Sequence, residues 1–476
     1  MMHAFDDSDG HELWGYIPKN QLTSLSNLNG TLHAYFIDGS PKVYYLDNNN
    51  NGVIEATDSD GNHDKVILIF GERRGQGSGP SYHAIDVTDP DQPKFLWDIK
   101  RGDTNLTELG QTWSTPNIVQ IQVTVGASTV TKNVFFIGGG YDPVNEDAAP
   151  ATADTQGRAV YAINVTDGSV VWKYTLTNNA SMTFAFPSDV TVLDTNRDGF
   201  ADRLYVGDVG GKMWRFDVGD LNTSNWTGRV LFQSNPGADG SSGRKILYPP
   251  DVTREVGHYF LYFGTGDREH PLDTTTAVDR IYAVKDVDGS SALLTESELT
   301  DVTTDELQAT TSQSTITTDL ASLTASSGWF IMLDLNAGEK VVGSPVVFNK
   351  VVNIPTFQPT STSGPVNPCL ADVGIGRVYA VNYKTGEAVF NYDVTNDGQY
   401  SSVNSRAQSN GTDVLLRSDR VVTVGSGIPS EVVIVIPQTG SGACDAMAMA
   451  GIGGGVAGLS ASCGGTTQRI FWRQLL

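Results

Sequence analysis

The sequence predicts an all-β chain folded as a modified seven-bladed β-propeller with long insertions between its strands. Apolar residues occur in short alternating runs, and the 51 glycines suit the tight turns that join such runs. Helical periodicity is nearly absent. In addition, a four-residue pattern recurs seven times along the chain. Short strands that repeat at blade-length intervals are typical of propellers.

Several apolar runs are bounded by turn residues and predict strands. They are KVILIF (65–70), NVFFIGGG (133–140), YFLYFGTG (259–266) and EVVIVIP (431–437). The best helical candidate is Pro18–Leu28, where Leu22, Leu25 and Leu28 have the spacing of a short surface helix.

The repeated pattern is an aromatic residue, His or Ile, then usually a small residue, then an apolar residue, then Asp, Asn or Lys. Its copies are HAFD (3–6), HAID (83–86), YAIN (161–164), WRFD (214–217), YAVK (282–285), IMLD (331–334) and YAVN (379–382). Successive copies lie 48 to 80 residues apart. The shortest intervals match one four-stranded blade, and the longer ones match a blade with an insertion.

The first copy of the pattern lies at the N-terminus, so the strands that should precede it in its blade are missing there. We therefore expect another part of the chain to complete this blade and close the ring. The segments 413–425 and 468–476 can supply them, so N- and C-terminal strands would pair and remove the exposed sheet edges. Residues 1–476 would then form a single propeller domain. Two β-sandwiches remain the alternative. Because the chain begins within the pattern and shows no signal peptide, we expect the C-terminal part of a longer exported protein.

Four segments interrupt the strand pattern. Residues 47–64 are acidic and rich in Asn, and residues 142–157 are rich in Pro, Ala and Asp. Residues 286–327 are rich in Thr, Ser and acidic residues, which predicts partial disorder, and the Gly-rich residues 440–465 predict no clear fold. Function is often carried by such insertions.

Composition excludes several classes of function. A net charge of −23 argues against binding to nucleic acid or to an anionic membrane, since both need a basic surface. No apolar run reaches the length of a membrane-spanning helix. The three cysteines, Cys369, Cys444 and Cys463, form no CxxC pair. One disulfide, most simply Cys444–Cys463, with one free thiol is an open alternative.

The strongest candidate site is the stretch DTNRDGFAD, residues 194–202. It places oxygen-bearing side chains at Asp194, Asn196, Asp198 and Asp202, with the carbonyl of Phe200 among them. Ca²⁺ takes six to eight oxygen ligands, which alternate residues of a tightly curled loop supply, and Gly199 allows the turn. The flanking residues predict strands, unlike the helices of an EF-hand. The alternative is an Asx-rich turn without metal.

A second loop repeats this spacing. Its candidate ligands are Asp47, Asn49, Asn51, the Val53 carbonyl and Glu55. Gly52 stands at the turn position. A competing register uses Asp58, Asp60 and Asp64, with Gly61 at the turn. A solvated polar loop without metal is the alternative.

The other motifs of the sequence do not indicate a catalytic or binding site. Arg101-Gly102-Asp103 is an RGD tripeptide, which integrins can recognise, but an ordinary turn between strands explains it equally well. The eight tryptophans are expected to pack between blades. No nucleophile elbow, P-loop or dinucleotide-binding motif is present, so we expect neither an enzyme nor a small-molecule substrate.

The phrases HAFDDSDGHELWGYIP, SYHAIDVTDP, RLYVGDVGGKMWRFD, FLYFGTGD and FWRQLL resemble, in order, the C-terminal domain of the PilY family of type IV pilus biogenesis factors. The resemblance implies a quinoprotein-type propeller with Ca²⁺ on Asp194, Asn196, Asp198, Phe200 and Asp202. It also implies a place at the cell surface, at the pilus tip and outer membrane, where the calcium-loaded state opposes retraction.

The resemblance further implies partners and activities. The partners would be minor pilins, the outer-membrane secretin machinery, and a host or abiotic surface. The activities would be pilus assembly, surface attachment and twitching motility. Integrin binding does not transfer, because Arg101–Asp103 is not at the family's RGD position.

Two other classes of protein remain open. One is a quinone-dependent dehydrogenase with Ca²⁺ at the centre of the propeller, although such enzymes usually have eight blades and an adjacent Cys pair. The other is a non-catalytic outer-membrane assembly scaffold whose calcium is structural.

Overall fold

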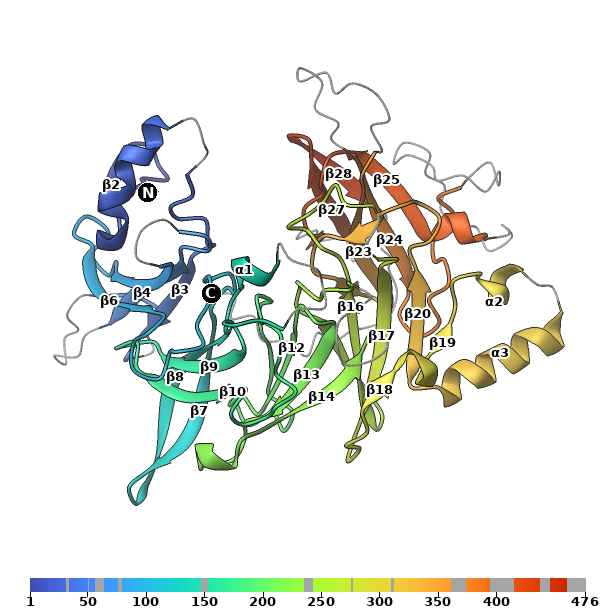
Figure 1. The fold of residues 1–476 in the computed structure, drawn as a ribbon, viewed down its shortest axis with the longest axis horizontal. Helices are drawn as coiled ribbons and strands as arrows, with labels where there is room; N and C mark the ends of the chain where they lie inside the picture. Colours follow the sequence, from blue (N-terminus) through green and yellow to red (C-terminus); the bar gives the residue numbers. More distant parts are fainter. Residues whose placement is uncertain are drawn as a thin grey trace. The chain divides into compact units, whose positions relative to one another are not determined.

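The computed structural model describes residues 1–30, 34–49, 51–55, 64–75, 79–146, 153–234, 243–274, 277–309, 312–360, 374–393, 415–436 and 446–459. The chain divides into two compact units (Figure 1). The first contains Met1–Val209 and Trp214–Arg229, and the second contains Gly210–Met213 and Val230–Leu476. Within the described residues, no helix has the length and apolar character needed to cross a membrane.

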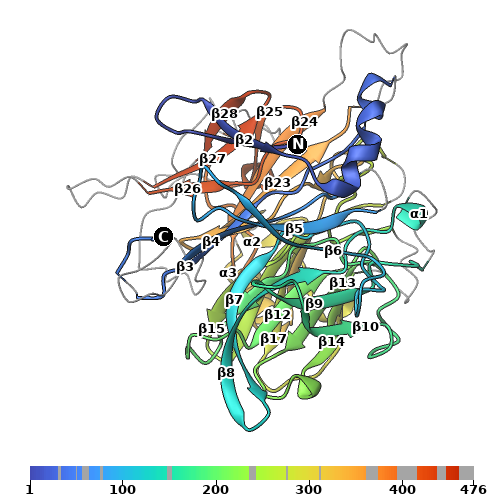
Figure 2. The ribbon, with the colours of Figure 1, turned by 90° about the vertical axis from the view of Figure 1, so that its left-hand side faces the viewer.

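The first unit contains antiparallel sheets built from consecutive strands. The smallest pairs β1 (Met2–Phe5) with β2 (Glu12–Tyr16). A four-stranded sheet follows, with β3 (Lys42–Leu46), β4 (Lys65–Gly71), β5 (Ser81–Asp86) and β6 (Lys94–Lys100). The next contains β7 (Asn117–Val125), β8 (Ser128–Gly138), β9 (Ala159–Asn164) and β10 (Val170–Thr175). Figure 2 shows β7 and β8 as a long hairpin.

A five-stranded sheet contains the positions at which the chain passes from one unit to the other. Its order is β11 (Thr191–Leu193), β12 (Arg203–Gly207), β13 (Lys212–Asp217), β14 (Thr227–Gln233) and β18 (Leu294–Thr295). The last pair is parallel. The candidate loop at 194–202 joins the first two strands of this sheet.

The described residues of the second unit form three further sheets. The first has the order β15 (Asp251–Glu255), β16 (His258–Gly264), β17 (Arg280–Val287), β20 (Gly328–Met332) and β19 (Thr300–Asp301). The next has β21 (Lys340–Val341), β23 (Val351–Gln358), β24 (Ile375–Asn382) and β25 (Val421–Ser426), with β22 (Val346–Phe348) also paired to β23. The last has β26 (Val433–Val435), β27 (Met447–Ile452) and β28 (Gly455–Leu459).

Helical segments are short. The α-helices are α1 (Pro143–Glu146), α2 (Glu306–Ala309) and α3 (Gln313–Ala325). The 3₁₀ segments are η1 (Lys19–Asn29), η2 (Thr223–Asn225), η3 (Glu296–Glu298) and η4 (Arg417–Arg420). The predicted surface helix at Pro18–Leu28 therefore exists, but it is a 3₁₀ segment.

The all-β prediction is confirmed, but counting each pattern copy as one blade is wrong. Five copies lie on β5, β9, β13, β17 and β24, each the third strand of its sheet. The copy at 331–334 begins on β20, which belongs to the same sheet as β17. The sheet of β26, β27 and β28 contains no copy. Pairing to the neighbouring strand decides sheet membership, and a local pattern does not report that pairing.

The described residues do not show the predicted ring closure by residues 413–425. Strand β25 pairs with β24 and ends that sheet. The other predicted closing segment, 468–476, lies outside the described residues, as do the three cysteines.

Two insertions have more structure than their composition predicted. Residues 286–327 contain β18, β19, α2 and α3, so the expected partial disorder is wrong for the described part. Residues 446–459 form β27 and β28, whose Ala448, Ala450 and Leu459 are buried in a core with β24 and β25. Small residues suffice there because the neighbouring sheet covers them.

A tryptophan closes the space between two sheets of the first unit. The Trp97 Nε1 on β6 donates a hydrogen bond to the carbonyl of Val165, at 3.0 Å, in the turn after β9. Its ring stacks on Phe135 of β8, with centroids 5.9 Å apart. A Cβ placed on Gly168 would lie 2.9 Å from the Trp97 ring. The glycine, at φ +70°, is therefore required both by the turn and by the indole.

The second unit repeats this contact. The Trp329 Nε1 on β20 donates to the carbonyl of Tyr383, at 3.3 Å, in the turn after β24. A Cβ on Gly386, at φ +71°, would lie 3.3 Å from the Trp329 ring. The acceptor follows the last residue of a pattern copy in both units, and the glycine comes three residues later. The prediction that aromatic residues pack between sheets is confirmed for both tryptophans.

Truncation of Trp329 should destabilise the second unit. Trp329 is fully buried, so Trp329→Ala is expected to lower the free energy of unfolding by about 3–5 kcal/mol. Chemical denaturation followed by circular dichroism measures the change. The control is Val256→Ala, because Val256 is 99% exposed and its change should stay within about 0.5 kcal/mol. Equal effects of the two variants would contradict the packing role of Trp329.

Candidate metal centre

The loop of residues 194–202 is held at its base by a hairpin. Strands β11 and β12 pair antiparallel with Leu193 opposite Arg203. The Asp202 N–H donates to the Leu193 carbonyl at 2.9 Å, which closes the loop. The flanking strands predicted from the sequence are therefore confirmed.

The loop curls around the carboxylate of Asp194. One of its oxygens accepts hydrogen bonds from the N–H groups of Arg197, at 2.6 Å, and Asp198, at 3.2 Å. The other accepts from the N–H of Gly199, at 2.8 Å. Gly199 has φ +92° and open space around it, so the turn selects glycine for its backbone conformation and not for lack of room.

The side-chain oxygens of Asn196 and Asp198 also accept hydrogen bonds from backbone N–H groups of the loop. The Asn196 side-chain oxygen accepts from the Asp198 N–H, and an Asp198 oxygen accepts from the Phe200 N–H, both at 2.9 Å. The Asn196 amide also donates to the other Asp198 oxygen, at 2.9 Å. Each oxygen-bearing side chain is thus turned towards the inside of the loop.

Asp202 closes the loop from the other end. Its carboxylate accepts hydrogen bonds from the N–H and hydroxyl of Thr195 and from the N–H of Asn196, between 2.7 and 3.3 Å. Burial raises the pKa of Asp202 above its ordinary value, and the bonds from Thr195 and the charge of Arg203 oppose that shift. A cation placed beside this carboxylate would favour its charged form.

Contacts outside the loop anchor its C-terminal half. The Ala201 N–H donates to the Gln120 carbonyl of β7, and the Val218 N–H donates to the Asp202 carbonyl. A Cβ on Gly219 would lie 2.8 Å from the Asp202 Cβ. The half that carries Asp202 is therefore fixed by the sheets, while Asn196 and Asp198 are exposed.

The donor set suits a hard cation, although the carboxylates do not form a compact cluster. Across the part of the chain that the structure describes, no three Asp, Glu, His or Cys side chains gather closely enough to hold a metal ion by themselves. Their oxygens accept backbone N–H groups here. Each carboxylate offers about four acceptor positions, so these bonds leave capacity for an ion.

The loop after β3 has the same hydrogen bonds. The Asp47 carboxylate accepts from the N–H groups of Asn51, at 3.3 Å, and Gly52, at 2.8 Å. The Asn49 oxygen accepts from the Asn51 N–H, at 2.9 Å, and the Asn51 oxygen accepts from the Val53 N–H, at 2.7 Å. Position by position, these four bonds match four of the six bonds that Asp194, Asn196 and Asp198 make in the first loop. Both loops join the first two strands of a four- or five-stranded sheet.

The hydrogen bonds favour Asp64 as the counterpart of Asp202. Asp64 directly precedes β4, as Asp202 precedes β12, and it accepts from the N–H of Asn48, at 2.8 Å, as Asp202 accepts from that of Thr195. Asp64 also accepts from the Glu55 N–H. A ligand role for the Glu55 side chain stays a prediction. Asp58 and Asp60 of the competing register lie outside the described residues.

The sequence analysis placed Asp202 correctly at the end of the first loop, but it named Asp64 only in the competing register with Asp58 and Asp60 and not together with Asp47, Asn49 and Asn51. The signal for Asp64 was its place immediately before an apolar strand, the place that Asp202 also has. Nothing in the sequence pointed to Thr195 or to the anchoring Gln120 carbonyl.

The RGD tripeptide forms a turn after β6. The Lys100 N–H donates to the Asp103 carboxylate, at 2.9 Å, and the Arg101 guanidinium donates to the Gln156 side chain, at 2.6 Å. Gly102 has φ +92°. The local bond between Lys100 and Asp103 supports the interpretation as an ordinary turn.

The chain is similar to known proteins of one family. A family model described as the PilY1 beta-propeller domain matches residues 1–322. The type IV pilus biogenesis factor PilY1 of Pseudomonas aeruginosa PAO1 is 27% identical over 435 residues, which cover 81% of this chain and 34% of the relative. A PilY1 homolog of Xylella fastidiosa is 24% identical over 455 residues, covering 88% of this chain and 28% of the relative. The chain thus spans about a third of these relatives.

One solved structure agrees on the fold. The crystal structure of the Pseudomonas aeruginosa PilY1 C-terminal domain superposes with a TM-score of 0.61 at 19% identity, covering 95% of this chain and 89% of that chain. The family model covers more than half of the chain. The chain therefore belongs to the PilY1 family and carries its β-propeller domain.

Proposed function

We propose that this chain is the propeller domain of a type IV pilus biogenesis factor, and that Ca²⁺ in the loop of residues 194–202 lets it oppose pilus retraction. The relatives that carry this domain are named as pilus biogenesis factors. The observation that carries the calcium assignment is the inward hydrogen bonding of Asp194, Asn196 and Asp198 around one curled loop.

The physical basis is charge compensation. Asp194, Asp198 and Asp202 bring three negative charges into nine residues of a chain with net charge −23, so they repel one another without a cation. Bound Ca²⁺ supplies positive charge and takes oxygen ligands from these side chains, from Asn196 and from the Phe200 carbonyl. The exposed half of the loop would then be ordered against the half anchored by Gln120.

The same proposal extends to the fold and the surroundings of the domain. The seven sheets of the described residues would correspond to seven blades in a closed ring, as part of a longer exported protein. The domain would lie at the pilus tip and outer membrane. It would act there with minor pilins and the secretin machinery in assembly, surface attachment and twitching motility.

A second, weaker calcium site is proposed in the loop after β3. Its ligands would be Asp47, Asn49, Asn51 and the Val53 carbonyl, completed by Asp64 or by Glu55. This loop has fewer carboxylates among its first five positions, which lowers the expected affinity.

A structural role for calcium is the competing function, because the loop is tied to β7 and to the segment after β13. In that case the metal would stabilise an assembly scaffold without controlling retraction. Stability and pilus behaviour must therefore be measured separately.

Calcium binding should depend on the carboxylates of the loop. Isothermal calorimetry of the purified chain is expected to give a Kd between micromolar and millimolar. The double variant Asp198→Ala/Asp202→Ala should lose this binding. The charge-matched control is Asp7→Ala/Asp91→Ala, at two exposed residues outside both loops, and it should keep it. Calcium binding that survives in the loop variant and disappears with Asp64→Asn would assign the remaining site to the loop after β3.

Replacement of Gly199 should act through the backbone. Gly199→Ala forces a Cβ onto a residue at φ +92°, which costs about 1–2 kcal/mol, and calcium affinity should fall by about tenfold or more. Gly10 has φ +79° and equally open surroundings, so Gly10→Ala matches the strain without touching the loop. Calcium titration of both variants by calorimetry separates the effect of strain within the loop from the effect of backbone strain elsewhere in the chain. The same affinity in both would exclude a role for the Gly199 turn in binding.

The role in retraction is tested in cells that carry the full-length protein with the double loop variant. Surface pili should become fewer, and disabling the retraction motor should restore them. Counting pili by electron microscopy measures both effects. If pili stay absent when retraction is disabled, while the variant also unfolds more easily, calcium supports an assembly scaffold instead.

A further inference from the structure

The second unit contains a crossover that is unusual for sheets of consecutive antiparallel strands. Strand β19 pairs parallel to β20, with Thr300 opposite Trp329. The connection between the two strands carries α2 and α3. Figure 1 shows α3 extending beside these strands. Two neighbouring parallel strands need a long connection between them, and here α2 and α3 lie in that connection.

A cavity of about 230 Å³ lies under this crossover. Its walls come from β19, from both helices, from the turn after β24 and from η4. The lining residues used below are Asp301, Asp305, Asp319, Arg420, Leu307 and Leu323. Buried side chains form its floor, and exposed or half-buried side chains form its rim.

A buried ion pair lies at the floor. Arg420 is 1% exposed and Asp305 is 2% exposed. The Arg420 Nη1 donates to the carbonyls of Val302, at 2.8 Å, and Thr303, at 3.2 Å. Its Nη2 lies 2.9 Å from Asp305 Oδ1. Apart from this ion pair, neither carboxylate oxygen of Asp305 has a hydrogen-bond partner among the described residues, so this charge is incompletely satisfied, which is costly for a buried carboxylate.

A second carboxylate faces the same space from α3. The Asp319 Oδ2 is buried and also lacks a hydrogen-bond partner among the described residues. Asp301 adds a third carboxylate at the rim. Three carboxylates against the single guanidinium of Arg420 leave the cavity net negative, which favours a cation and excludes an anion.

The other residues that line the cavity do not suit a bare metal ion. Val302, Leu307 and Leu323 are buried apolar residues, and the described side chains form no group of three metal-binding carboxylates. A cation that carries its own apolar stem satisfies both parts of the surface, because the stem lies against the apolar walls while the head meets the carboxylates.

We propose that this cavity binds an organic ammonium or guanidinium group with a short alkyl stem, held by Asp305 and Asp319. The volume is below that of sites for drug-sized ligands, so it accommodates one such group and not a larger cofactor. The group could arrive as a free amine or as a Lys or Arg side chain of a protein, and both present the same chemistry. The inference is independent of the calcium loop.

The test is a titration of the purified chain with n-butylammonium chloride and n-butylguanidinium chloride by calorimetry. Saturable binding is expected on the order of millimolar Kd. Sodium chloride at the same ionic strength and neutral 1-butanol should give no saturable signal. A blocked Gly-Lys-Gly peptide distinguishes the sources. Binding as tight as that of the free amine supports a protein side chain, and binding of the amine alone supports a small ligand.

Asp319→Asn removes a rim charge and should weaken the affinity for the amine by roughly tenfold or more, the loss of a charge-assisted hydrogen bond. Asp91→Asn is the control, since Asp91 is an exposed residue of the first unit, and it should change the affinity less than twofold. Because Asp319 is half-buried on α3, its variant is expected to fold even if Asp305→Asn does not. No saturable binding of either cation, or equal losses in the two variants, would overturn the proposal.

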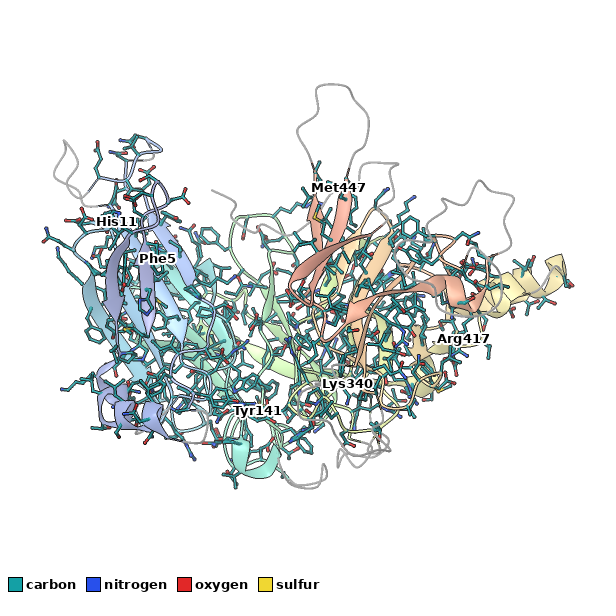
Figure 3. The ribbon with its side chains drawn as sticks, turned by 90° about the horizontal axis from the view of Figure 1, so that it is seen from above. Phe5, His11, Tyr141, Lys340, Arg417 and Met447 are labelled. Atoms are coloured by element: carbon teal, nitrogen blue, oxygen red, sulfur yellow. The ribbon has the colours of Figure 1, made fainter. Side chains whose placement is uncertain are left out.

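The pH dependence provides a second readout. Burial raises the pKa of Asp305 to about 6, although the nearby arginines lower it. Cation affinity should therefore rise between pH 5 and 7, as Asp305 loses its proton, and should level off above. The charged groups around Asp305 are Arg420 and Arg417 of η4 (Arg417 is labelled in Figure 3), Glu387, Asp301 and Asp319. Affinity that is constant across this range would exclude Asp305 as the group that meets the cation.

Discussion

The packing within each unit depends on the contact between a tryptophan on the fourth strand of one sheet, counted in hydrogen-bonded order, and a turn of another sheet. Trp97 and Trp329 each donate to a turn carbonyl and cover a glycine with positive φ. A large apolar ring fills the space between two twisted sheets, while its N–H donates a hydrogen bond to a backbone carbonyl of the neighbouring turn. The bond also fixes the ring against a single turn residue, so it sets how the two sheets meet.

The two candidate metal-binding loops, residues 47–64 and 194–202, occupy equivalent positions in their sheets. Asp194 and Asp47 both follow the first strand of a sheet, and Asp202 and Asp64 both precede the second. A hairpin end is free to change in length without disturbing the ladder. The loop of nine residues and the loop of eighteen therefore keep equivalent bonds at their bases. The first five positions then distinguish the two loops, because the shorter loop has two carboxylates there, Asp194 and Asp198, and the longer loop has only Asp47.

The insertion of α2 and α3 has a different consequence. It converts an edge of the β15–β20 sheet into a parallel pairing and encloses charged side chains that an open edge would leave in water. Asp305 and Arg420 are 115 residues apart in sequence, and their pairing at the cavity floor is incomplete. A buried ion pair of this kind contributes little to stability, which is why a binding role is the more informative explanation.

The sequence by itself determined the strands, the Gly-dependent turns and the ligand spacing at Asp194–Asp202, because these depend on residues close together in the chain. The sequence analysis did not predict α3, because the composition of residues 286–327 predicted partial disorder, although Ile316, Leu320 and Leu323 are helically spaced. Only the tertiary structure decided that β17 and β20 share a sheet, that Asp64 takes the place of Asp202 in the second loop, and that Asp305 meets Arg420. Those outcomes depend on strand pairing and on contacts between distant segments, which local patterns do not encode.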